Sequence, residues 1–117
     1  MVFTAEEKSF VIEADGKKLR VSYDMFHGDH EDAMKFCKEQ GGGDETVENL
    51  RFIARHKDAI NEELKKLGKV CISRGWYWTN ELAWWGDGWV FSVAMDRGYV
   101  NTNSCYGVSV ARAISAL

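Results

Sequence analysis

The chain has 117 residues, of which 45% are hydrophobic and 28% charged, values that are typical of one globular domain with a sizeable core. The formal net charge is −3 and no basic stripe offsets the acidic residues, which argues against nucleic acid as a partner. No segment approaches the ~20 apolar residues that span a bilayer, and the first residues lack the apolar region of a signal peptide. We therefore expect a single soluble domain over residues 1–117, without membrane insertion.

Two β-rich runs, residues 10–14 and 19–23, are separated by a stretch that begins with Asp15-Gly16. Asp-Gly between two such runs is a strong short-range signal for a β-hairpin. The sequence therefore predicts that the chain begins with an antiparallel pair of strands, followed by a connector at residues 25–29.

Three helices are predicted next. Asp29 or His30 can cap a helix that runs to about residue 40 and ends at three consecutive glycines. Thr46 is the natural cap of a second helix, and Asp58 can cap a third that ends at Gly68. The residues expected to face inward are Ala33, Phe36, Cys37 and Gln40 in the first helix, Val47, Leu50, Ile53 and Ala54 in the second, and Ala59, Ile60, Leu64 and Leu67 in the third.

The pattern then changes to strands, expected at residues 70–73, 76–79, 89–94, 99–101 and 108–114. An order of strands, helices and then many strands favours an α+β fold with an antiparallel sheet. We therefore expect two or three helices packed on short antiparallel β-sheets.

All five tryptophans lie between Trp76 and Trp89. Trp78 and Trp89 are flanked by β-type residues in strand-like runs, which favours places in the core. Trp84 and Trp85 are adjacent in a glycine-flanked turn, so at least one of them should meet solvent or a ligand.

The densest group of possible metal ligands is His27, Asp29, His30, Glu31 and Asp32. These residues lie in a loop that leads into a helix cap, and no third ligand accompanies the two histidines, so capping and solvation are favoured. No metal or cofactor is therefore expected.

Nucleophilic catalysis requires a thiol or hydroxyl beside a base, and no histidine follows His56. No CxxC pair exists among Cys37, Cys71 and Cys105, and Cys37 lies on the apolar face of its helix. An enzyme is not expected, although a thiol-dependent enzyme using the loop residue Cys105 stays an alternative.

Residues 80–88 and 101–107 are rich in Asn, Ser, Gly, Trp and Tyr. That composition is typical of adaptable binding loops on a rigid scaffold. Simple polar turns would have a similar composition, so both interpretations stay open.

Several motifs between residues 30 and 117 agree in order and spacing with a known pattern. They are a glycine-terminated helix over residues 33–37, a Thr-capped stretch at residues 46–50, the sequence Tyr77-Trp78-Thr79-Asn80-Glu81, a tryptophan before the strand at 89–94, the sequence of residues 96–101, and a closing Val-x-Val-x-Arg strand at residues 108–112. In these motifs the chain resembles the branch of the C-type lectin fold that includes the formylglycine-generating-enzyme type.

Within that branch the chain looks like the variable proteins of diversity-generating retroelements. The resemblance implies that a segment at about residues 76–117 is rewritten by mutagenic reverse transcription and displayed as a surface that binds a ligand. The implied display positions are Glu81, Trp84, Trp85, Asp87, Asn101, Asn103, Cys105 and Tyr106, and the implied scaffold positions are Trp78, Trp89, Gly98, Val108 and Val110.

The proline-containing calcium and sugar motifs of carbohydrate-binding C-type lectins are absent, because the chain has no proline. The resemblance therefore implies calcium-independent binding of a protein ligand, as in phage or viral receptor-binding proteins displayed on a virion or cell surface. The alternative is a lectin-fold adhesin or structural domain of a bacterial or phage surface assembly, without diversification.

Overall fold

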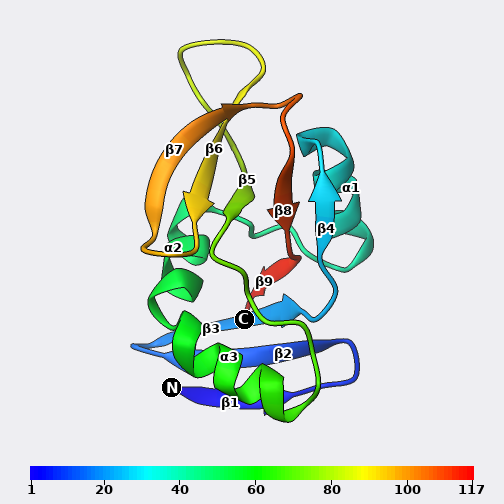
Figure 1. Ribbon diagram of the computed structural model, residues 1–117, viewed down its shortest axis with the longest axis vertical. Helices are drawn as coiled ribbons and strands as arrows, with labels where there is room; N and C mark the ends of the chain where they lie inside the picture. The colour runs from blue at the N-terminus through cyan, green and yellow to red at the C-terminus, as the bar shows by residue number, and fades with distance from the viewer.

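The computed structural model describes residues 1–117 as nine strands and three helices (Figure 1). The strands are β1 (Val2–Ala5), β2 (Ser9–Ala14), β3 (Lys17–Ser22), β4 (Phe26–Gly28), β5 (Trp76–Leu82), β6 (Trp89–Ala94), β7 (Tyr99–Ser104), β8 (Ser109–Ala111) and β9 (Ile114–Ala116). The helices are α1 (His30–Glu39), α2 (Val47–Arg55) and α3 (Lys57–Lys66). The α+β prediction is confirmed, with two mainly antiparallel sheets ordered β1-β2-β3-β9 and β4-β8-β5-β6-β7. None of the helices is both long and apolar enough to cross a membrane.

The predicted hairpin forms the centre of the first sheet. Ala14 pairs with Lys17, so the turn consists of Asp15 and Gly16 alone, with φ angles of 52° and 76°. A two-residue turn with both φ angles positive matches the twist of the strands that it joins, which explains the Asp-Gly sequence. The sheet gains β1, which was not predicted, on one side and the C-terminal β9 on the other.

Two of the three helix starts were predicted correctly. Asp29 caps α1 and accepts a hydrogen bond from the Asp32 amide, and Thr46 caps α2 in the same way. The third prediction was wrong, because α3 starts at Lys57, directly after His56 ends α2. Three of the residues predicted to face inward are exposed instead, namely Gln40, Ala59 and Leu67. Each lies where its helix ends or turns its polar face to solvent.

Three strand predictions needed correction. The supposed connector contains β4, whose residues pair with β8 from the end of the chain. Residues 70–73 form no strand; instead the Asn61 side chain binds the backbone of Ile72 in both directions. The single strand expected at residues 108–114 is divided into β8 and β9, which belong to different sheets.

The core has two parts, one on each face of the second sheet. Tyr77 and Val93 face the larger cluster of 16 buried residues, to which α2 and α3 contribute, whereas Trp78 and Val90 face a cluster of 6 shared with α1. Because neighbouring residues of a strand point to opposite faces, the Tyr77-Trp78 pair fills both clusters at once. The strands β5 and β6 are thereby held from both sides, and the loop between them projects from the far end of the molecule in Figure 1.

Candidate functional site

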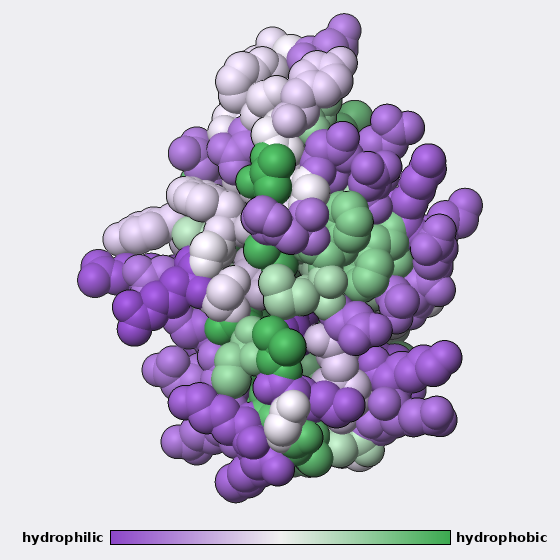
Figure 2. Space-filling view, turned by 45° about the vertical axis from the view of Figure 1, so that its right-hand side comes forward, coloured by the Kyte–Doolittle hydropathy of each residue, from purple (hydrophilic) through white to green (hydrophobic).

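Five large side chains lie exposed around the β5–β6 loop, and we call them the aromatic tip: Leu82, Trp84, Trp85, Trp89 and Tyr106. Trp84 is 87% exposed, Tyr106 86%, Trp85 51% and Trp89 44%. The surface at the upper end of the molecule in Figure 2 is mostly pale, which means intermediate hydropathy, whereas strongly hydrophilic purple is more frequent in the surface below it. Exposed aromatic rings that are gathered in one place are typical of interaction surfaces.

A backbone hydrogen bond closes the β5–β6 loop, and aromatic rings in the loop pack against each other and against the sheet. The Ala83 amide donates a hydrogen bond to the Trp89 carbonyl at 2.8 Å, which leaves residues 84–88 as the projecting segment. Trp84 meets Trp85 edge to face with ring centroids 5.5 Å apart, and Trp85 meets Phe91 of β6 in the same way at 5.7 Å. Two rings at right angles favour each other through their quadrupoles, so the Trp85 ring is held against the sheet while Trp84 extends into solvent.

The connection between β7 and β8 passes beside this loop. The Cys105 amide donates to the Gly88 carbonyl at 2.7 Å, and the Cys105 carbonyl accepts from the His30 amide at the start of α1 at 3.1 Å. Gly88 has a φ angle of 78°, and a Cβ there would lie 3.4 Å from the Cys105 sulfur. The backbone of Cys105 is therefore fixed between the tip loop and α1, which places Tyr106 at the tip.

The structure brings most of the predicted display residues to one end of the molecule. Trp84, Trp85 and Asp87 lie in the projecting loop, and Cys105 and Tyr106 lie beside it. Asn103 pairs with Val90 and donates to the Ser92 hydroxyl at 2.8 Å, next to the tip.

The other two display residues lie apart from this group. Asn101 pairs with Ser92 near the middle of β6, and its own side chain accepts a hydrogen bond from the Thr102 amide. Glu81 accepts a hydrogen bond of 2.7 Å from the Val47 amide, so its carboxylate serves the positive N-terminus of α2.

Two predicted scaffold residues are surface residues instead. Trp89 and Val108 are exposed, although the sequence predicted that both are structural. Trp89 shares a sheet face with Phe91 of β6, and the packing of α2 on β6 leaves the Trp89 side chain exposed. Sequence reasoning also missed Leu82, whose exposure strict alternation along β5 would not have indicated, because the neighbouring Glu81 is exposed as well.

Two cavities lie along the second sheet, and one of them adjoins the tip. One of about 470 Å³ lies beside Trp76 and Trp78 and reaches Asn103 and Val108. The other, of about 270 Å³, has apolar walls at Leu82, Val90 and Tyr106, and Asp29 and Glu31 also line it. A ligand that contacts Leu82 and Tyr106 could therefore insert a side chain into the second of these cavities.

The possible metal ligands at residues 27–32 and the Cys105 thiol lie near the start of α1. No three His, Cys, Asp or Glu side chains converge on one point, and Asp29 is used as a helix cap. His30 lies in the same cavity as Cys105, a neighbour that the sequence did not indicate, but its Nε2 pairs with the Thr79 carbonyl at 2.8 Å. No hydrogen bond joins this imidazole to the thiol.

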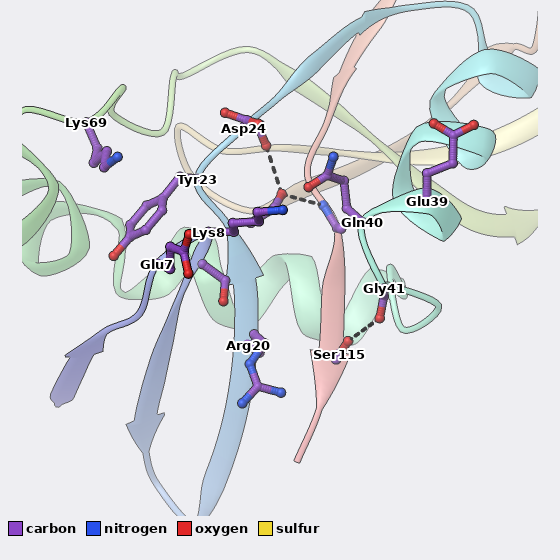
Figure 3. Close-up of a pocket in the computed structure, with 13 residues that line it drawn as sticks. Glu7, Lys8, Arg20, Tyr23, Asp24, Glu39, Gln40, Gly41, Lys69 and Ser115 are labelled. Carbon is purple, nitrogen blue, oxygen red and sulfur yellow. Dashed lines mark hydrogen bonds between the residues drawn. The ribbon is translucent and has the colours of Figure 1, made fainter.

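The largest cavity lies elsewhere, where the first sheet meets the end of α1 (Figure 3). It measures about 500 Å³, and charged side chains of both signs surround it, including Lys8, Asp24, Glu39 and Lys69. Only two of its thirteen lining residues are hydrophobic, whereas small-molecule sites are lined mostly by apolar groups. None of the predicted display residues lines it.

Comparisons with protein-family models, with curated proteins and with solved structures found no match for this chain.

Proposed function

We propose that this domain is a non-enzymatic binding protein with a C-type lectin fold that presents the aromatic tip and its neighbours to a protein ligand. The observation that carries the proposal is the exposure of four aromatic rings in and beside a loop whose two supporting strands are anchored on both faces. In such interfaces a few aromatic residues dominate the binding energy, and truncation of one costs about 2 kcal/mol or more.

The division between anchored and free side chains further supports a display function. Trp78 is buried and hydrogen-bonded, whereas Trp84, Asp87 and Tyr106 make no side-chain hydrogen bond within the chain. Substitution of the free side chains removes little that the fold needs, so such positions tolerate change. This tolerance is what diversification by a retroelement requires.

A display library tests the binding function directly. We would randomise Trp84, Trp85, Asp87, Asn103, Cys105 and Tyr106, and select the library against several unrelated folded proteins. A control library would randomise six exposed positions far from the tip: Val2, Lys18, Ala59, Glu62, Lys65 and Lys66. We expect binders from the tip library alone, with most of its clones folded. Widespread unfolding in the tip library, or equal yields of binders from both libraries, would contradict the proposal.

The DNA around the coding sequence tests the diversification. We expect a reverse transcriptase gene and a near-identical repeat of the region that encodes residues 76–117, with differences confined to adenines of the repeat. A locus without either feature would leave the non-diversified adhesin as the better description.

A further inference from the structure

A positively charged surface lies at the end of β6 that is opposite the aromatic tip. Arg51 and Arg55 of α2 and Arg97 of the β6–β7 turn line a cavity of about 230 Å³, together with Ala54 and Gly98 alone. Three of the five lining residues therefore carry a guanidinium group, and none carries a carboxylate. This concentration of positive charge is notable in a chain whose net charge is −3.

Local structure explains why the three side chains meet. Arg51 and Arg55 are four residues apart in α2, which places them on the same side of the helix. The Gly98 amide closes the β6–β7 turn with a 2.7 Å hydrogen bond to the Ala94 carbonyl, and Gly98 has a φ angle of 75°. A Cβ on Gly98 would lie 3.7 Å from the Cβ of Ala54, so two small residues let the turn approach α2 closely.

The three guanidinium groups have no anionic partner within the chain. All four ion pairs of the structure use other cations, namely Lys17, Arg20, His56 and Lys66. Glu48 and Glu81 share a neighbouring cavity with Arg51 and Arg55, but Glu48 pairs with Lys17 at 3.2 Å and Glu81 accepts from the Val47 amide. Asp96 precedes Arg97 in the chain and forms no ion pair with any of the three arginines. The Arg55 guanidinium lies over an aromatic face, 6.0 Å from the Phe52 ring centroid.

We propose that Arg51, Arg55 and Arg97 bind a phosphate dianion, either free or as the terminal group of a phosphate monoester. A guanidinium group presents two parallel N–H donors that match the oxygens of phosphate, and several such groups around one anion leave few of its oxygens unpaired. Three positive charges outweigh the two of the anion, and the cavity is small enough for one such group with its substituent directed to solvent. A phosphodiester has one charge and two substituents, and so it fits the same site less well.

Titration of ¹⁵N-labelled protein at constant ionic strength tests the site. The probes are inorganic phosphate, N-acetyl-O-phosphoserine amide, dimethyl phosphate and acetate, and the signals are the Gly98 amide and the Nε–H groups of the three arginines. We expect saturable shifts with one or both of the first two probes, and affinity at least about tenfold lower for the diester and for acetate. The comparison of phosphate with the monoester distinguishes a free ion from a phosphorylated ligand. Shifts that do not saturate, or that are equal for all four probes, would overturn the proposal.

Substitutions distinguish anion binding in this cavity from a general effect of net charge on anion affinity. The double variant Arg51→Gln/Arg97→Gln should bind at least about tenfold more weakly than the unmodified chain. The control is Arg74→Gln, an exposed arginine outside the cavity that makes no ion pair, for which the affinity should stay within about twofold. Equal losses of affinity in the two variants would mean that net charge alone explains the binding, and would refute the proposed site.

If the double variant does not fold, Arg51→Lys replaces it, because lysine keeps the charge and loses the bidentate donors. We expect this single variant to bind several-fold more weakly, and unchanged affinity would count against the proposal. The aromatic tip is not involved, so this result is independent of the proposed function.

Discussion

The indole Nε1 of Trp78 donates a hydrogen bond of 2.8 Å to the carbonyl oxygen of Gly28, fifty positions earlier in the chain. This bond joins β5 to β4, which lies across β8 in the same sheet. The His30 ring packs edge to face on the same indole at 5.3 Å, so the start of α1 is fixed there as well. The strand that leads into the aromatic tip is thus anchored before the tip begins.

Trp78 and Trp84 should respond very differently to truncation. Trp78 is 1% exposed, so Trp78→Ala should lower the free energy of unfolding by about 3–5 kcal/mol through cavity formation and the lost hydrogen bond. Trp84 projects into solvent, and Trp84→Ala should change the free energy of unfolding by no more than about 0.5 kcal/mol. Urea denaturation of the two variants measures both values, and equal losses would show that the tip rings support the fold.

Arg112 should be essential for the irregular segment before β5. Its buried guanidinium donates to the carbonyls of Ser22 and Tyr23 and to those of Val70 and Cys71, at 2.9 to 3.2 Å. A lysine cannot reach four acceptors, so Arg112→Lys should cost roughly 2–4 kcal/mol by leaving buried carbonyls unpaired.

Hydrogen exchange localises the effect of Arg112→Lys. The Ile72 amide, which donates to the Asn61 side chain at 2.7 Å, should exchange faster in the variant than amides in β2 and β3. The control is Arg74→Lys, at an exposed arginine nearby, which should leave both stability and exchange unchanged. Uniform acceleration across the whole chain would argue against a local role.

Glu45 should make stability depend on pH. Burial raises the pKa of this carboxyl above its ordinary value of 4.5, although the amides of Ile114 and Gly43 donate to it and act in the opposite direction. The folded state therefore binds the proton more tightly than the unfolded state does. As the pH falls from neutral through the raised folded pKa to about 4.5, the free energy of unfolding should rise relative to that of Glu45→Gln, and the difference should then stay constant.

Denaturation of both proteins at a series of pH values checks this, and a difference that does not vary with pH would contradict it. Glu6 affects stability in a separate pH range, because hydrogen bonds from Arg20 and Ser9 lower its pKa to about 2. Its contribution is present above pH 4.5 and is lost as the pH falls toward about 2, so the two carboxyls do not obscure each other.

The three thiols should differ in reactivity. Burial raises the pKa of Cys37 to about 12, and the nearby Glu45 carboxylate adds to the effect. The thiolate is the reactive species, so in the folded protein iodoacetamide should leave Cys37 unmodified while the partly exposed Cys71 and Cys105 react. Mass spectrometry of digested samples measures this, with urea-unfolded protein as the control in which all three react. Modification of Cys37 at the rate of Cys105 would mean that the α1 face opens readily.

The candidate site was only partly predictable. The cluster of tryptophans and the glycine-flanked turn indicated that Trp84 or Trp85 meets solvent, and both do. The exposure of Trp89 could not be seen, because a strand sequence does not say how far a helix extends over its face. The arginine cavity was not predicted either, since Arg97 lies more than forty residues from its two partners.

Features whose causes lie within a few residues could be predicted from the amino-acid sequence. The Asp15-Gly16 turn follows from the φ angles that these residues tolerate, and the caps at Asp29 and Thr46 follow from side chains that bind amides three positions ahead. The bounds of β6 were also predicted correctly from its run of β-forming residues. The pairing of strands that are distant in the chain depended on the folded structure. It divided residues 108–114 between two sheets and turned a connector into β4, because strands gain their hydrogen bonds from partners that lie about eighty to a hundred residues away in the chain.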